Sequence, residues 1–181
     1  MNEKEGCPGR TESLDVILRK WPDAMAIVRG SAEYSGINGF VRFYQTQCGV
    51  VVAAEIMGLP KNAREVAPVS TTGETGCQSP VFGFHIHENG QCSGTVSNPF
   101  ADVGSHYNPE SCEHPHHAGD MPPLFGNDGY ALSVFLTDRF SVSDVIGRAV
   151  IIHRDPDDFT TQPSGNSGKM IACGEIRMFR R

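Results

Sequence analysis

Short runs of β-branched and aromatic residues, separated by breaks that contain Gly or Asn, constrain the fold of this chain most strongly. Such runs are typical of β-strands, and no convincing helical pattern lies between them. They occupy residues 24–30, 39–46, 48–59, 80–88, 130–137, 145–153 and 171–178. Seven or eight short strands without intervening helices predict an all-β fold, either an antiparallel sandwich or a barrel.

Two long stretches lack this pattern, and we expect both to be loops. Residues 60–79 are polar and rich in Gly, Thr and Ser. Residues 89–129 contain many Gly, Pro, Asn and His residues. A stretch of about 40 residues without strands is too long for a simple connection, so the second loop is predicted to be functional.

The first 22 residues differ from the rest of the chain. Within them, residues 11–20 (TESLDVILRK) place Leu14, Ile17 and Leu18 on one helical face, and Pro22 stops the pattern. We therefore expect an N-terminal extension with a short helix at residues 1–22, followed by one β-domain at residues 23–181.

Composition argues against several classes of protein. The net charge is -6 and no basic stripe is present, which argues against nucleic acid as a partner. The longest apolar stretches, such as residues 49–56, are far too short to cross a membrane. The N-terminus lacks the apolar core of a secretory signal, so a cytoplasmic location is the expectation.

The cysteines give no clear pattern of their own. No CxxC motif is present, which argues against a zinc site built from thiolates. From spacing alone, it stays open whether any two of them form a structural disulfide. The six are Cys7, Cys48, Cys77, Cys92, Cys112 and Cys173.

All seven histidines lie between residues 85 and 153. Neutral imidazole is a common protein ligand for zinc and copper, so this clustering predicts a metal site. His85 and His87 are two residues apart in a predicted strand and therefore project from the same face. His153 ends another predicted strand and could supply a third nitrogen to the same ion.

A second group lies in the long loop. His106, His114 and His117 with Asp120 offer three nitrogens and one carboxylate oxygen, a set suited to tetrahedral zinc. His116 is the surplus member, either exposed or a competing ligand. Asp157 follows His153 by four residues and could accept a hydrogen bond from a ligand imidazole, or could belong to a solvated turn.

Five short motifs then follow one another in a familiar order. They are GFHIHE at residues 83–88, GSHYNP at 104–109, HAGD at 117–120, VIGR at 145–148 running to His153, and GNSG at 165–168 leading to ACG at 172–174. Together they make the chain similar to the copper–zinc superoxide dismutase family across roughly residues 24–181.

This resemblance implies an eight-stranded Greek-key β-barrel of the immunoglobulin-like superoxide dismutase type, with its active site outside the barrel wall. It implies disproportionation of superoxide to dioxygen and hydrogen peroxide, with copper and zinc as cofactors. His106 would bridge the two ions and pass a proton to the product. Copper would be held by His85, His87, His106 and His153, and zinc by His106, His114, His117 and Asp120.

The resemblance also implies supporting features. A disulfide would join Cys92 to Cys173, and Asp157 would link the two metal sites through ligand histidines. Members of such a family pair through different faces, so a homodimer is one open option for the oligomeric state.

The chain departs from the family pattern in two places. The family has an arginine three positions before the last cysteine, where it attracts superoxide, and here that position is Met170. The neighbouring Lys169 is a flexible point charge that can replace the arginine only in part. Only two residues separate His114 from His117, where the family has more, so either His114 or His116 could be the middle zinc ligand.

Two alternatives to the enzyme stay open. One is a metal-handling β-sandwich that binds copper and zinc with little turnover, which Met170 and the negative charge favour. The other is a structural or interaction domain that keeps only the zinc site.

Overall fold

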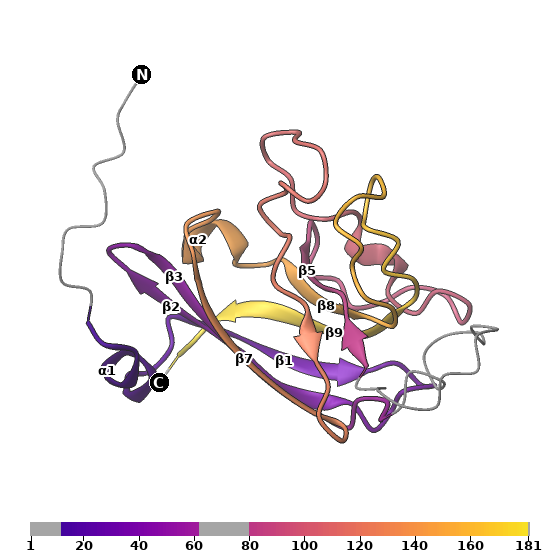
Figure 1. Ribbon diagram of the computed structural model, residues 1–181, viewed down its shortest axis with the longest axis horizontal. Coiled ribbons are helices and arrows are strands. Elements are labelled where there is room, and N and C mark those ends of the chain that lie inside the picture. Colours follow the sequence, from indigo (N-terminus) through magenta and orange to yellow (C-terminus); the bar gives the residue numbers. More distant parts are fainter. Residues whose placement is uncertain (1–11, 62–79, 181) are drawn as a thin grey trace.

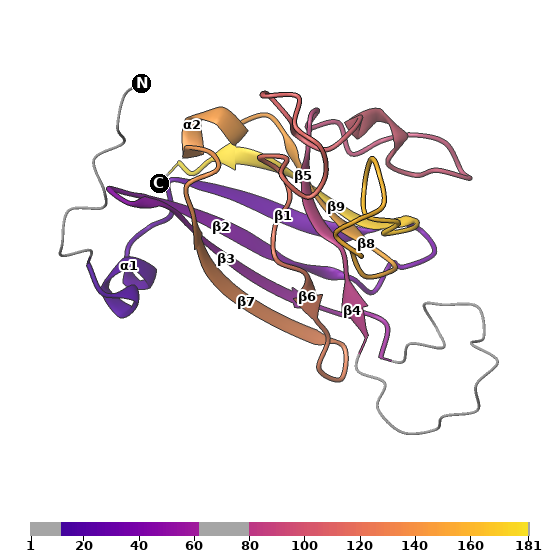
Figure 2. The same cartoon turned by 45° about the horizontal axis from the view of Figure 1, so that its top comes forward.

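The computed structural model describes residues 12–61 and 80–180, and within this part it confirms an all-β fold. Seven strands form one antiparallel sheet in the order β5-β8-β9-β1-β2-β3-β7, and β4 pairs with β6. Figures 1 and 2 show that the large sheet is strongly curled. The main cluster of buried apolar residues takes side chains from all seven of its strands. The described part contains no helix that is long and apolar enough to cross a membrane.

The strands are short and the helices are few. The strands are β1 (Ala24–Gly30), β2 (Asn38–Thr46), β3 (Gly49–Met57), β4 (Val81–Phe82), β5 (Phe84–His87), β6 (Leu124–Phe125), β7 (Tyr130–Thr137), β8 (Ala149–His153) and β9 (Met170–Met178). The helices are α1 (Leu14–Arg19) and α2 (Val142–Val145), with a 3-10 turn, η2, at Ala101–Val103.

The predicted strand at residues 80–88 is divided into β4 and β5 at Gly83. The Gly83 amide donates a hydrogen bond to the Asp155 carbonyl, outside any sheet ladder. A Cβ atom at this position would lie 2.8 Å from the Ser167 side chain, so the loop after β8 packs directly on the break. The described residues therefore form nine strands, and the predicted count of eight is not confirmed.

The predicted strand at residues 145–153 is shorter in the structure: Val145 is the last residue of α2, a turn follows it, and β8 begins at Ala149. Ser141 and Asp144 form a capping box that starts α2, in which the Ser141 amide donates to Asp144 Oδ2 at 2.8 Å. The Ser-x-x-Asp pattern that signals such a helix start is present in the sequence. The apolar residues that follow Asp144 resemble a strand, so the sequence pattern predicted a strand from Val145 and no helix.

The N-terminal helix lies on the outer face of the sheet. Val50 and Val52 of β3 face the core, while Val51 and Ala53 face outward as strand alternation requires. The outward pair is nevertheless buried, because Ile17 of α1 packs on it together with Tyr44. The boundary between an extension at residues 1–22 and a domain at 23–181 stays a prediction.

A disulfide between Cys92 and Cys173 ties the loop after β5 to β9, as the resemblance implied. It joins residues 81 positions apart in the sequence, with their Cα atoms 5.8 Å apart. Cys48 is also disulfide-bonded. Cys112 is the free cysteine of the described part, and Cys7 and Cys77 lie outside the described residues.

Candidate metal centre

Strand β5 and the end of β8 bring the first histidine set together. Phe84 and Ile86 of β5 point into the core, so His85 and His87 point to the opposite face. Strand β8 pairs with β5 in antiparallel register and ends at His153. His106 joins from the long loop through a β-bridge to His87.

The four side chains surround one small space. His85, His87, His106 and His153 are all buried, and their candidate ligand atoms lie within 4.8 Å of one another. His87 Nε2 and His153 Nε2 are 3.3 Å apart, and the rings of His85 and His106 have centroids 3.9 Å apart. The structure therefore places together the four residues that the resemblance assigned to copper.

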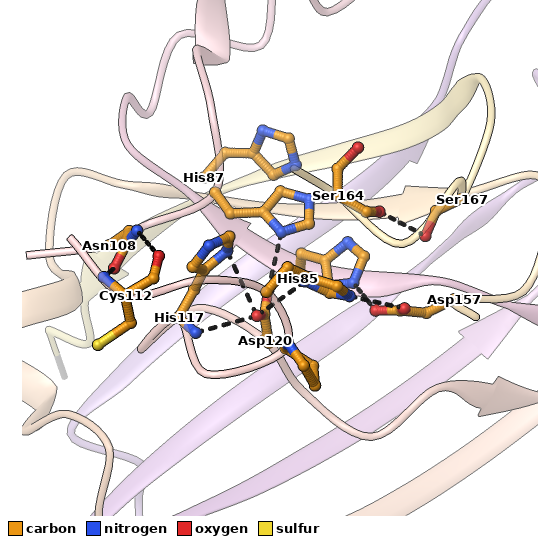
Figure 3. Close-up of polar contacts among 12 residues, drawn as sticks. His85, His87, Asn108, Cys112, His117, Asp120, Asp157, Ser164 and Ser167 are labelled. Carbon is orange, nitrogen blue, oxygen red and sulfur yellow. Dashed lines mark hydrogen bonds and ion pairs between the residues drawn. The ribbon is translucent and has the colours of Figure 1, made fainter. Parts of the chain in front are cut away.

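A second buried set adjoins the first and shares His106. His106, His114, His117 and Asp120 also have candidate ligand atoms within 4.8 Å of one another. The Asp120 carboxylate lies 2.8 Å from His106 Nδ1, 3.0 Å from His114 Nδ1 and 3.3 Å from His117 Nδ1. Figure 3 shows the contacts of Asp120 with the surrounding imidazoles.

Four ring nitrogens of these sets are buried without a hydrogen-bond partner, namely His85 Nδ1, His106 Nε2, His114 Nδ1 and His117 Nδ1. The last two lie close to Asp120, but their geometry does not make a hydrogen bond. Buried polar atoms nearly always have a partner, and unpaired imidazole nitrogens are the atoms that bind zinc or copper. The residues present therefore fit two metal ions that share His106.

Burial also keeps the imidazoles in the form that metals bind. Desolvation lowers the pKa of His85 to about 4 and that of His87 to about 3. It lowers the pKa of His153 well below its ordinary value, and that of His117 is lowered for the same reason. Neutral histidines at pH 7 have a lone pair available for a metal.

Asp120 keeps its negative charge despite its burial. Burial alone raises the pKa of this carboxyl group, but the hydrogen bond from His106 and the neighbouring histidines lower it to about 2. The second set therefore combines three imidazoles with one carboxylate, the composition expected for zinc.

Asp157 connects the two sets. Its Oδ2 lies 2.7 Å from His85 Nε2, and its Oδ1 lies 2.8 Å from His114 Nε2 (Figure 3). Asp157 is buried, which excludes the solvated turn that the sequence left open. Because the carboxylate occupies Nε2 of both rings, it leaves Nδ1 of each ring free to face its own set.

His114, and not His116, lies in the second set. His116 is exposed and lines a small surface pocket with Glu110 and Asp138. Gln162 holds His114 by two hydrogen bonds, accepting from its amide at 3.0 Å and donating to its carbonyl at 2.7 Å.

Sequence reasoning missed two residues that hold the ligand loop, Gln162 and Arg139. Arg139 donates to three carbonyl groups of the loop. Both residues act on backbone atoms, so no sequence motif could have identified them.

The first set opens to solvent through a cavity of about 640 Å³. Met170 lies at its wall, in register with His153 across the β8–β9 pair. Glu88 and Glu113 also line the cavity, whereas its described lining contains no lysine or arginine. Lys169, the predicted substitute for the family's arginine, is paired with Glu33 and is not part of this lining.

Comparisons with known proteins agree with this geometry. The family model described as copper/zinc superoxide dismutase (SODC) matches residues 37–176. Superoxide dismutase [Cu-Zn] 2 of Aquifex aeolicus (strain VF5) is 33% identical over 156 residues, covering 78% of this chain and 80% of the relative. Superoxide dismutase-like protein YojM of Bacillus subtilis (strain 168) is 39% identical over 110 residues, covering 52% of this chain and 55% of that protein.

A solved structure extends the likeness to the fold. The crystal structure of a double mutant of a SOD-like protein from Bacillus subtilis superposes with a TM-score of 0.62 at 29% sequence identity. The match covers 83% of this chain and 94% of that chain.

Proposed function

Because the chain belongs to the copper/zinc superoxide dismutase family, we propose that it converts superoxide to dioxygen and hydrogen peroxide at a copper ion that shares His106 with a zinc ion. The observation that carries this proposal is the pair of adjoining buried donor sets with His106 in both. A homodimer and a cytoplasmic location stay predictions from the sequence.

Four imidazoles would hold copper. His85 would use Nδ1 and His106 would use Nε2, the two buried nitrogens that lack other partners. His87 and His153 would use the Nε2 atoms that already face each other. A copper ion in this set would supply the one-electron redox cycling that zinc cannot supply.

Zinc would take the remaining donors and would orient His106. Nδ1 of His106, His114 and His117 and one oxygen of Asp120 suit a closed tetrahedral site. Fixing Nδ1 of His106 in this way directs its Nε2 toward the first set.

His106 is also the group in this site that could move a proton. Its Nε2 is buried without a hydrogen-bond partner, and the residue lines the solvent-connected cavity. An imidazole held at one nitrogen can gain and release a proton at the other. We expect His106 Nε2 to deliver a proton as hydrogen peroxide forms.

One observation favours a second candidate, a metal-handling protein with little turnover. Glu88 and Glu113 line the cavity and its described lining has no lysine or arginine, so this lining has no permanently charged cationic side chain to draw in an anion. Met170 occupies the wall position where the family's arginine is expected.

Metal analysis and superoxide turnover on one preparation separate these candidates. If the protein is the enzyme, we expect one copper and one zinc per chain. Superoxide turnover should disappear in His106→Ala and persist in the matched control His116→Ala. Both metals with negligible turnover would support metal handling. Zinc alone would support the structural alternative.

A further inference from the structure

The side chain of Arg139 forms hydrogen bonds to the loop that carries His117 and Asp120. Arg139 lies in the connection between β7 and α2, 19 residues after Asp120. Its Nη1 lies 3.0 Å from the carbonyl oxygen of Pro115, 3.2 Å from that of His117 and 3.1 Å from that of Asp120. Two of these carbonyls belong to residues whose side chains complete the second donor set.

The barrel fixes the position from which Arg139 acts. The Arg139 amide donates to Thr137 Oγ1 at 3.2 Å, and Thr137 pairs with Val50 at the end of β7. The next residue, Phe140, is buried with its ring edge-on to Phe43 in the core. The guanidinium therefore extends from a rigid base toward a loop that has little regular structure.

Two of the contacted carbonyls, those of His117 and Asp120, belong to the turn that carries these two ligand residues. The Asp120 amide donates to the His117 carbonyl at 3.2 Å, and the His117 amide donates to Asp120 Oδ2 at 3.1 Å. Fixing the peptide planes of this turn fixes the directions of both side chains. Hydrogen bonds from a guanidinium are charge-assisted and stronger than those between neutral groups.

We propose that Arg139 is a positioning residue for the zinc site, which it holds in its binding geometry before the ion arrives. This inference rests on the proposed function, since it assumes that the second set binds zinc. The guanidinium carries the same sign of charge as zinc, and its three hydrogen bonds to the loop all go to backbone carbonyls. Any increase in zinc affinity that Arg139 gives must therefore come from the orientation of the loop.

The test measures zinc binding by the full chain with a competing chelator, in the wild type and three variants. Groups that orient metal ligands are worth about 10- to 100-fold in affinity, so Arg139→Gln should raise the zinc dissociation constant by that factor. Arg139→Lys keeps a charged donor and should recover part of the loss. Arg42→Gln removes an equal charge from a pair with Glu55 on strands β2 and β3, and it should leave the zinc dissociation constant unchanged.

The visible absorption of cobalt(II) bound in place of zinc gives a second readout, because its bands follow ligand geometry. They should change in Arg139→Gln and stay unchanged in Arg42→Gln. Wild-type zinc affinity and wild-type cobalt bands in Arg139→Gln would overturn the inference, as would equal losses in Arg139→Gln and Arg42→Gln. If the wild type itself binds no zinc at this set, the proposed function fails and this inference fails with it.

Discussion

The backbone of Gly165 lies directly against the carboxylate of Asp157. A Cβ atom on this glycine would lie 1.9 Å from Asp157 Oδ1, and it would also lie 2.7 Å from His114 Nε2. Since Oδ1 is the atom that meets His114, the connection between the two histidine sets leaves no room for a side chain at position 165.

Gly165→Ala should therefore weaken the binding of both metals. The added methyl group would displace Asp157 from His114, and the rings would lose the partner that fixes their orientation. Gly147→Ala is a matched control, because Gly147 also has a positive φ (79° against 66°) but has nothing within 4 Å of its Cβ position. Competition with a chelator should show that the affinity for each metal falls at least about tenfold in Gly165→Ala. Equal affinities in the two variants would contradict this reading.

Asp157→Asn should weaken metal binding, and an asparagine that keeps its oxygen at the Oδ1 position can still accept from the Phe159 amide. The two rings meet different oxygens of Asp157, and asparagine replaces one of these oxygens by an NH₂ group that donates, so it can accept at only one of the two positions. We expect a loss of about 10- to 100-fold in affinity at one or both sets. The exposed neighbour Asp158, which caps the turn at Thr160 and Thr161, supplies the control variant Asp158→Asn. If both variants retain wild-type affinities for copper and zinc, the linking role of Asp157 is wrong.

Met170→Arg should raise superoxide turnover at low ionic strength. The arginine stem can pack where the methionine packs. The guanidinium would bring positive charge to the wall of a cavity whose described lining has two glutamates and no lysine or arginine. The gain should reach up to about tenfold and should shrink as salt is added. Met170→Gln, similar in length and neutral, should give no gain. A salt-independent change, or the same gain with glutamine, would rule out electrostatic attraction as the cause.

The metal-free protein should lose stability as the pH falls below about 6. The folded state holds the pKa of His85 at about 4 and that of His87 at about 3, below the ordinary value of 6.5. Between these values the unfolded chain binds protons that the folded chain does not, so acid favours unfolding. Each histidine contributes a slope of about 1.4 kcal/mol per pH unit.

Urea unfolding from about pH 6 down to about pH 4.5 measures this slope. His87→Gln should reduce the slope by one histidine's share. Replacement of the exposed His116 by Gln should leave it unchanged. A flat dependence of the unfolding free energy on pH in the wild type would mean that these histidines are not buried in the neutral form.

Local pattern predicts the strands well and their interruptions poorly. Strand β7 has the predicted bounds because its apolar residues and flanking turns agree. The break at Gly83 and the start of α2 were missed. The break depends on Ser167 packing from another loop, and the capping box at Ser141 precedes an apolar run that looks like a strand.

In the site, too, local pattern predicts some residues, whereas others depend on contacts between distant parts of the chain. Strand alternation places His85 and His87 on one face, and motif order identifies the other ligands. The Asp-Pro-Asp-Asp segment by itself could not predict the burial of Asp157, because it suits both a solvated turn and a buried link; only the resemblance implied the link. Lys169 was expected to guide substrate, but it is paired with Glu33, 136 positions away in the sequence. Long-range contacts of that kind leave no local pattern.

The proposed sharing of His106 between a copper ion and a zinc ion has a direct magnetic test. Electron paramagnetic resonance of the copper(II) protein with cobalt(II) in place of zinc provides it, because ions bridged by one imidazole couple magnetically. We expect the copper(II) signal to be largely lost when cobalt binds and to persist when zinc binds. A full-strength, unaltered copper signal beside bound cobalt would contradict the shared ligand.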